Sequence, residues 1–423
     1  MERVVDPSGV IVRIHYASLR NFIFWSTLIG LFSDILTIRV PVGITLFDGI
    51  MIMNLILMLM LGNLVRIPVR ILSIMLYLAV SGGIGILLGT DTIMLVAKEV
   101  LGISVSMLYA YYFFRMIGND IERAFTTYST IAFWFAVIAL PIWAASCIYS
   151  REFIRLRGLA AEPTGFCILV LPAYYWYAYR YFTFRVQGTR VAVFTLAMIL
   201  ADSSNGFIGT ILGATLLLSG RRNLKYLFAV PVVVGAITAL VYISSSEVRL
   251  RADDTLRAVV RQDVAGTNFS TYAIMSNVFV ARQVLKESPF LGNGLGSHPL
   301  SHERFLAEIP GVARFVQNGW ADLNAPEGAS LAVRTLSELG VLGFSCELIF
   351  VFYFHVGGKG PRAAISNAIL VVFFIKLLRG GHYFPAEQFF FIFIYILNHQ
   401  LHKLEVRSIA RRTSSKFRWC LSA

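Results

Sequence analysis

The residues most able to carry chemistry gather at three places, and the first is the stretch 155–165. It holds Arg155 and Arg157, followed by Glu162-Pro163. Guanidinium groups bind phosphate oxygens through paired hydrogen bonds, and a carboxylate can accept a proton. Because proline favours the first position of a helix, we expect a helix to begin here, with both arginines in the loop before it. The alternative is an interfacial loop whose arginines contact lipid head groups.

The second place is the glycine-rich stretch 288–298, which has glycine at every second position from Gly292 to Gly296 and ends at His298. It does not match the dinucleotide-binding fingerprint, because Ser297 occupies the position of the third glycine and the stretch follows a predicted helix. We interpret it as a tight turn that presents backbone N–H groups and His298 to an anion.

The third place begins at Glu327 and continues into an apolar run with Arg334 and Glu338. An ionisable residue inside a membrane span is a functional candidate. Two residues four positions apart can also form a plain intrahelical ion pair, so both interpretations stay open. Further candidate ligands for an anion, each of which could equally lie on a solvated helix face, are Arg249, Arg251 and Arg282.

The composition indicates the elements that must position these groups. The chain has 423 residues, of which 57% are hydrophobic and 14% charged, with a mean hydropathy of +0.69. Soluble domains carry about 25% charged residues, so the composition excludes a cytosolic enzyme, a disordered protein and a secreted disulfide scaffold. The four cysteines show no paired spacing, which argues against a zinc site. The sequence predicts an all-α polytopic membrane protein without a cleavable signal peptide, metal or cofactor.

Apolar runs near the length of a spanning helix, about 20 residues, mark the expected spans. They are 20–38, 44–62, 71–88, 93–114, 129–148, 164–179, 226–244, 329–354, 363–379 and 386–401. The stretch 191–219 could be one helix or two joined near Asp202. Basic clusters precede and follow it, and the positive-inside bias favours a hairpin that keeps both on the cytoplasmic side. We therefore expect about twelve spans with both termini cytoplasmic.

The polar segment 246–328 is expected to form a largely helical periplasmic insertion, with helices near 272–286 and 303–316. It contains 8 Lys/Arg and 9 Asp/Glu, although the whole chain carries a net charge of +13. The excess positive charge therefore lies in the rest of the chain, on the expected cytoplasmic loops and tail, where it reports orientation and argues against a nucleic-acid partner. The expected organisation is spans over 1–245, the insertion, spans over 329–402 and a basic cytoplasmic tail over 403–423.

The order of these motifs resembles a known family. The basic loop ending in Glu-Pro precedes the insertion and its Pro-x-x-Gly-x-Gly-x-Gly turn, and the next span carries Val333, Leu336, Glu338, Gly340 and Gly343. This order is similar to that of the O-antigen ligase and Wzy-type polymerase superfamily of bacterial inner-membrane glycosyltransferases. The resemblance implies a GT-C-like enzyme at the periplasmic face. Such an enzyme joins glycans carried on undecaprenyl diphosphate without a nucleotide sugar or metal.

The resemblance favours the polymerase branch, because Ala329 and Ser330 stand where ligases often carry His-Asn. The expected catalytic groups are Arg157, Glu162, His298 and Glu327. The expected substrate ligands are Arg155, Arg249, Arg251, Arg282, Arg334 and Glu338. The implied partners are the lipid-linked glycan as donor and acceptor, membrane lipid and a chain-length regulator. The alternatives are an O-antigen ligase and a transporter or flippase, although the sequence lacks the internal repeat of many transporters.

Overall fold

The computed structural model describes residues 9–33, 37–39, 43–61, 67–160, 162–219, 239, 242–243, 246–261 and 264–421. This part of the chain is almost entirely helical, in agreement with the all-α prediction, apart from one hairpin of three-residue strands. The predicted span 226–244 falls largely outside the described residues.

The first half of the chain alternates long helices and short loops. Its elements are α1 (Gly9–Gly30), β1 (Thr37–Arg39), β2 (Gly43–Thr45), α2 (Leu46–Met60), α3 (Val69–Leu87), α4 (Ile93–Met116), α5 (Ile121–Ser150), α6 (Pro163–Phe184), α7 (Gly188–Ala201) and α8 (Ser204–Ser219). The run 20–38 was expected to be one helix. Instead, α1 ends at Gly30 and the chain turns into the β1–β2 hairpin.

The second half contains shorter helices followed by three long ones. Its elements are α10 (Ser246–Arg261), α11 (Phe269–Glu287), α12 (His298–Phe305), the 3₁₀ turn η1 (Leu306–Glu308), α13 (Ala313–Gln317), the 3₁₀ turn η2 (Ala325–Glu327), α14 (Leu331–Tyr353), α15 (Pro361–Leu378) and α16 (Ala386–Leu421). The helix predicted over 272–286 corresponds to α11.

The single helix predicted over 303–316 is wrong, because two residues interrupt it. Pro310 lacks the N–H that a helix needs, and Gly311 adopts a positive φ of 79°. The chain therefore forms α12 and η1 before this point and α13 after it.

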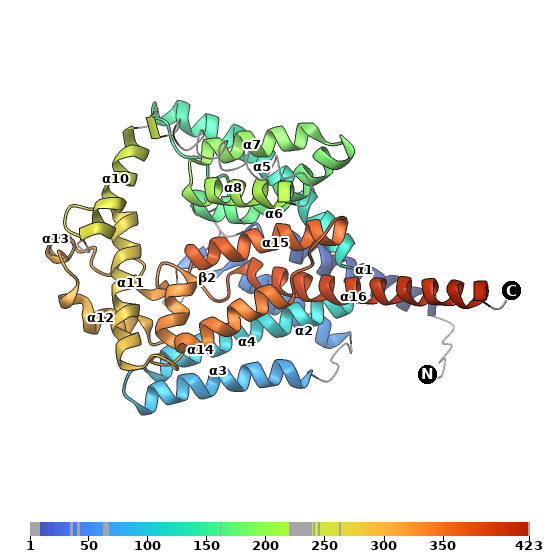
Figure 1. Ribbon diagram of the computed structural model, residues 1–423, viewed down its shortest axis with the longest axis horizontal. Coiled ribbons are helices and arrows are strands. Elements are labelled where there is room, and N and C mark those ends of the chain that lie inside the picture. The colour runs from blue at the N-terminus through green and yellow to red at the C-terminus, as the bar shows by residue number, and fades with distance from the viewer. Residues whose placement is uncertain are drawn as a thin grey trace.

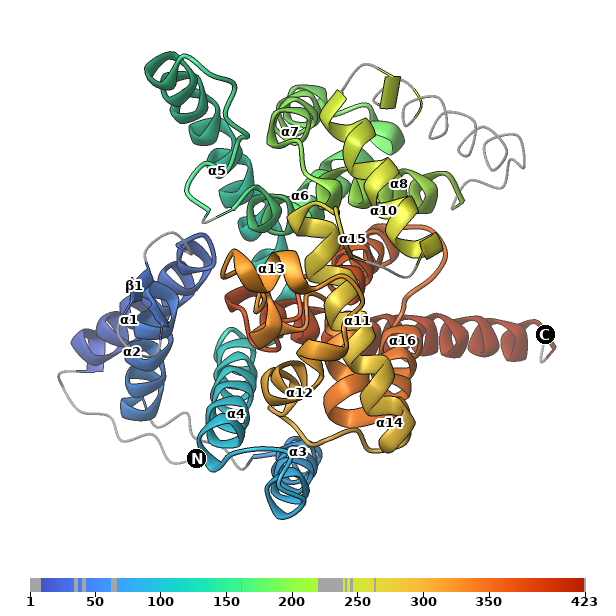
Figure 2. The same cartoon turned by 90° about the vertical axis from the view of Figure 1, so that its left-hand side faces the viewer.

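Helices α10 to α13 gather at one end of the molecule, whereas the C-terminal part of α16 extends beyond the opposite end (Figure 1). We call the end that carries α10–α13 the insertion end. Figure 2 looks onto it and shows α11 lying across the ends of the long helices. This segment has its own apolar core, in which the rings of Tyr272 and Phe315 stack with centroids 3.7 Å apart.

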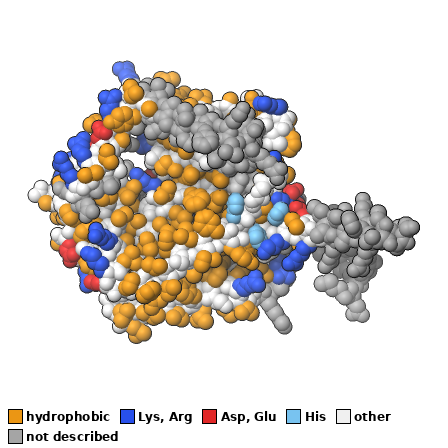
Figure 3. All heavy atoms as spheres, in the orientation of Figure 1, with side chains coloured by type: hydrophobic (Ala, Val, Ile, Leu, Met, Phe, Trp, Pro, Cys, Tyr) orange, Lys and Arg blue, Asp and Glu red, His pale blue; other side chains and the backbone are white. Residues whose placement is uncertain are grey.

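The long helices present an apolar surface. Hydrophobic side chains cover the middle of the molecule in Figure 3, while charged ones gather toward its two ends. Five of the described helices (α3, α4, α5, α14 and α15) are long and apolar enough to cross a membrane. The weakly buried α3 exposes Leu72, Leu76, Val80 and Leu87. These features indicate a membrane protein.

The stretch 191–219 forms two helices, as the charge pattern predicted. Helix α7 ends at Asp202, which adopts a left-handed conformation with φ 42°, and α8 begins at Ser204. Both helices pack against α6. The chain therefore reverses at Asp202-Ser203 and does not cross the bundle in a single long helix.

Candidate functional site

The glycine-rich turn after α11 is joined to α14 by main-chain hydrogen bonds. They run from Asn293 N to Ser337 O (3.0 Å), from Gly294 N to Glu338 O (2.9 Å), from Val341 N to Pro289 O (2.9 Å) and from Leu342 N to Phe290 O (3.2 Å). We call this junction the glycine clasp. It forms where α14 breaks at Gly340, whose φ of 63° and ψ of −164° are not helical.

Glycine is needed in the clasp because two backbones touch there. A Cβ at Gly340 would lie 2.4 Å from the carbonyl carbon of Phe290, and a Cβ at Gly292 would lie 2.5 Å from Ser337 O. The turn was expected to offer its N–H groups to an anion. Two of them, at Asn293 and Gly294, instead donate to carbonyls of α14. The glycine spacing therefore serves the attachment of the insertion end.

His298 lies inside this attachment with no exposed surface. Its Nε2 is 2.8 Å from Asn277 Oδ1. Burial, together with the positive charge of Arg334, lowers the pKa of His298 to about 3, so the ring is neutral near pH 7. In this conformation the imidazole cannot reach a substrate, and its expected catalytic role gains no support from its position.

Arg334 occupies a buried ion cluster and is 2% exposed. Its Nη2 lies 2.9 Å from Glu99 Oε1 on α4, and its Nε donates to Glu338 Oε1 at 2.9 Å. Its Nη1 donates to Gly381 O at 3.3 Å, and the guanidinium lies 4.4 Å from the centroid of the Tyr383 ring. The intrahelical pair is thus present, and it extends to α4 and to the loop 379–385.

Glu162 and Glu327 lie close enough to interact electrostatically, although they are far apart in the sequence. Glu162 is the exposed N-cap of α6, and Glu327 ends η2. Partial desolvation raises the pKa of Glu327, whose side chain still reaches solvent. The charge of Glu162 raises this pKa further, while Arg334 and Lys376 oppose the shift. A carboxyl group with a raised pKa suits proton transfer near neutral pH.

A pocket of about 260 Å³ borders the N-terminus of α6, which follows Glu162, and the loop 379–385, which packs on Glu327. Lys376 and Glu387 lie in its wall, and Lys376 Nζ is 2.5 Å from Glu387 Oε1. The remaining lining residues are Leu31, Thr45, Phe47, Asp48, Thr164, Gly165, Ile168, Leu169, Gly380, His382, Phe384, Pro385 and Ala386. The lining therefore combines apolar side chains with ionisable groups.

The N-terminus of α6 contributes to this pocket. Glu162 makes no side-chain hydrogen bond as N-cap, and Pro163 has no N–H. Thr164 and Gly165 line the pocket, and among the described residues no acceptor is found for their N–H groups. The first N–H groups of a helix attract negative charge. The motif 155–165 thus brings the donor end of a helix to the pocket.

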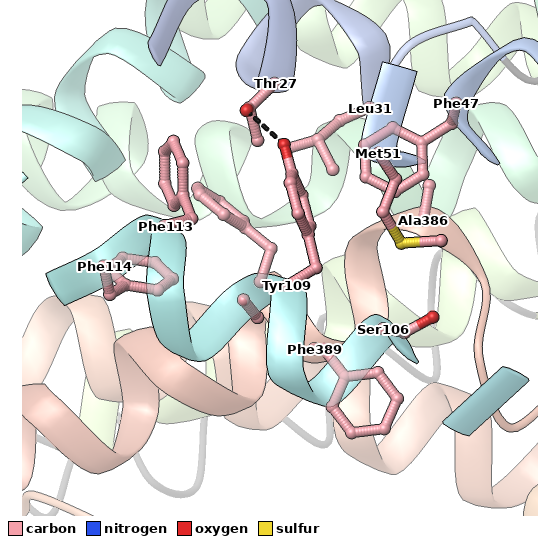
Figure 4. A pocket seen from close by; sticks show the side chains of 12 residues that line it. Thr27, Leu31, Phe47, Met51, Ser106, Tyr109, Phe113, Phe114, Ala386 and Phe389 are labelled. Atoms are coloured by element: carbon pink, nitrogen blue, oxygen red, sulfur yellow. Dashed lines mark hydrogen bonds between the residues drawn. The ribbon is translucent and has the colours of Figure 1, made fainter. Parts of the chain in front are cut away.

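A second cavity, between α1, α2, α4 and α16, is not a substrate site. Figure 4 shows it enclosed by aromatic and aliphatic side chains, with Thr27 and Tyr109 hydrogen-bonded above them. Its volume of about 20 Å³ has room for roughly one water molecule.

The other predicted residues lie in different surroundings. Arg155 donates to the carbonyls of Ala201 and Asp202, so it stabilises the C-terminal end of α7. Arg157 has an exposed side chain in the same loop. Arg249 donates to the carbonyl of Ile243, at 2.7 Å.

Two further arginines belong to the insertion segment. Arg282 is exposed on α11. Arg251 belongs to α10, and its side chain lies outside the described residues.

The sequence analysis missed Glu99, Lys376, His382 and Glu387. The available signal was an ionisable residue inside or at the edge of an apolar run, which marks a functional candidate in a membrane protein. Burial lowers the pKa of His382 to about 3, with Arg334 and Lys376 adding to the shift, so this imidazole is neutral. The described part of the chain contains no cluster of His, Cys, Asp or Glu able to hold a metal ion.

Fold and pocket define a helical membrane protein with a pocket lined in part by ionisable residues. Comparison with family models, curated proteins and solved structures found no match.

Proposed function

We propose that this protein is a glycosyltransferase of the bacterial inner membrane that polymerises undecaprenyl-diphosphate-linked oligosaccharide units. The observation that supports the proposal is that two separate sequence motifs come close to each other near one pocket. Glu162 and Lys376 both interact electrostatically with Glu327. Thr164 and Gly165, which follow Glu162-Pro163, line the same pocket as Lys376 and Glu387. The product is O-antigen or exopolysaccharide, and the active site faces the periplasm.

The chemistry of such a transfer matches the groups available. An acceptor hydroxyl attacks the anomeric carbon while the lipid diphosphate leaves. A base must take the hydroxyl proton, and Glu327 and Glu162 are the carboxylates that the two motifs supply near the pocket. Positive groups must stabilise the departing charge, a contribution of about 3–4 kcal/mol for each well-placed donor. Arg157 is an exposed arginine of the adjoining loop and belongs to the motif 155–165.

The proposed topology follows the helix order. In this topology about twelve helices cross the membrane, both termini are cytoplasmic and α10–α13 are periplasmic. The position of α10–α13 at one end and of the C-terminal part of α16 beyond the other supports this assignment (Figure 1). The near-neutral insertion, with 8 basic and 9 acidic residues, favours a polymerase over a ligase. A ligase that docks anionic lipopolysaccharide core would gain from a basic surface.

The test is reconstitution of the purified chain with undecaprenyl-diphosphate-linked repeat units as the only substrate. We expect a ladder of longer lipid-linked chains, and we expect Glu327→Gln to reduce it at least tenfold. Glu308→Gln is the matched control, because Glu308 is an exposed glutamate of the same insertion segment. Transfer that begins only when lipid A-core is added would replace the polymerase with the ligase. Movement of intact lipid-linked units across the bilayer without elongation would identify a flippase.

A further inference from the structure

The wall of the pocket combines two kinds of anion-binding group that lie far apart in the sequence. One is the N-terminus of α6, where the Thr164 and Gly165 N–H groups have no acceptor among the described residues. The other is the ammonium group of Lys376 at the end of α15, which is 3% exposed. Both line the same pocket of about 260 Å³. Orphan N–H groups and a lysine together are a common way to bind phosphate.

Lys376 is held by a carboxylate that also borders the pocket. Its Nζ lies 2.5 Å from Glu387 Oε1 in the first turn of α16. A carboxylate beside a buried ammonium occupies the place that an anionic ligand could take. The other carboxylate that lines the pocket, Asp48, already accepts hydrogen bonds from a neighbouring residue. Its Oδ2 accepts hydrogen bonds at 2.8 Å from both the N–H and the hydroxyl of Thr45.

We infer that this pocket binds a phosphate or diphosphate group through Lys376 and the N-terminus of α6, and that Glu387 is the internal counter-ion which the ligand displaces. The choice of a phosphate anion rests on the proposed function. The apolar lining residues Leu31, Ile168 and Phe384 fit the hydrocarbon that adjoins the phosphate of a lipid. The same anion chemistry also fits free pyrophosphate, and the experiment separates these two sources.

The inference predicts opposite effects for the two members of one ion pair. Replacing Lys376 removes a ligand of the anion and weakens binding. Replacing Glu387 by glutamine removes the competitor and tightens binding. If the pair served only folding, replacing either partner would leave a buried charge uncompensated. Both single variants would then destabilise the protein, and neither would bind the anion more tightly.

The measurement is isothermal titration of the full chain in phosphatidylcholine nanodiscs, with inorganic pyrophosphate and with farnesyl diphosphate as probes. We expect Glu387→Gln to lower the dissociation constant at least threefold. We expect the double variant Lys376→Gln/Glu387→Gln, which leaves no unpaired charge from this pair, to raise it at least tenfold. Lys286→Gln, an exposed lysine on α11, is the control and should leave binding unchanged.

Tighter binding of farnesyl diphosphate than of pyrophosphate would assign the site to a lipid-linked phosphate. Equal affinity would assign it to the free anion. Absence of binding by both probes, or weaker binding in Glu387→Gln, would overturn the inference. Because the titration requires no glycan transfer, binding without polymerisation would leave this site standing while the proposed function failed.

Discussion

Thr335 donates its hydroxyl to Glu347 Oε1 at 2.8 Å, although the two residues are twelve positions apart in the same helix. In a straight α-helix they would be about 18 Å apart along the axis, from a rise of 1.5 Å per residue. The hydrogen bond therefore requires α14 to bend sharply, and the bend lies at Gly340. The part before Gly340 and the part after it are two helices in different directions.

The bend determines the surroundings of the buried ion cluster. Arg334 and Glu338 belong to the short part before Gly340, where Arg334 also contacts Gly381 in the loop 379–385. The same loop packs on Glu327, because a Cβ at Gly381 would lie 1.6 Å from Glu327 O. The cluster therefore supports the loops at the pocket.

Gly340→Ala should destabilise the protein, because alanine would collide with the Phe290 carbonyl group and would be strained at a positive φ. Backbone strain of this kind alone costs roughly 1–3 kcal/mol. The measurement is the thermal unfolding midpoint in detergent. Gly83→Ala is the control, because a Cβ at Gly83 meets nothing within 4 Å. An equal decrease of the unfolding midpoint in both variants would contradict a stabilising role of the glycine clasp.

Arg334→Met should be more harmful than loss of an exposed arginine. It leaves Glu99 and Glu338 buried without their shared cation, at a cost of about 3–5 kcal/mol for a broken buried pair. The comparison is Arg304→Ala, which breaks an exposed pair with Glu287 worth about 1 kcal/mol or less. Denaturation of both variants in the same detergent measures the difference, and similar midpoints would exclude a stabilising cluster.

Asp91, in the loop between α3 and α4, should make stability depend on pH. Burial raises its pKa to about 7 from 3.8, and the charges of Glu338 and Glu99 add to the shift. The folded state thus retains a proton that the unfolded chain releases. The resulting stabilisation is complete below about pH 4 and is lost as the pH rises to about 7.

Asp91→Asn should remove this part of the pH dependence. The check is the unfolding midpoint measured between pH 4 and pH 8. Asp120→Asn is the control, since Asp120 is exposed and asparagine can still cap α5. If the unfolding midpoint of Asp91→Asn changed with pH as it does in the unmodified protein, other groups would be responsible for the pH dependence.

Arg157→Ala should abolish polymer formation while the protein still inserts into the membrane, if Arg157 binds the lipid diphosphate. Arg157→Lys should lose most of the activity, because an ammonium group cannot form the paired hydrogen bonds of a guanidinium. Product ladders from membranes with equal protein levels measure both effects. Arg314→Ala, an exposed arginine of α13, should retain activity. Full activity in Arg157→Ala would remove this residue from the site.

Reporter fusions at Ser203 and Gly220 should report opposite sides of the membrane, because α8 lies between them and is proposed to cross it. A fusion at Ser203 should report the periplasm. The expected contrast follows from the basic clusters on either side of α7 and α8. The same side at both positions would eliminate this hairpin from the topology.

The sequence predicts most helices because apolar run length and loop charge are local signals. Charge alone favoured the reversal near Asp202, and α7 and α8 meet there. The helix expected over 303–316 failed because Pro310 and Gly311 carry the stronger local signal. Apolar run length also hid the bend at Gly340, because an unbroken apolar run carries no sign of a change in helix direction.

The candidate site was less predictable, because its contacts join distant segments. The motif 155–165 was singled out correctly as a loop before a helix, but its neighbours Lys376 and Glu387 are more than 200 residues away. The glycine spacing from Gly292 to Gly296 was recognised in the sequence. The carbonyl groups of α14 that accept hydrogen bonds from this turn could be identified only from the three-dimensional structure. Arg155 was expected at the substrate and instead binds the end of α7.

The glycine clasp has a consequence for how this protein can evolve. Its hydrogen bonds use amide and carbonyl groups, which almost every amino acid carries. These main-chain hydrogen bonds therefore depend on a few glycines and do not involve exposed side chains of the turn such as Phe290 and Leu291. Substitutions at exposed positions of α10–α13 can accumulate without loosening this anchor, which leaves the surface of the insertion free to diversify.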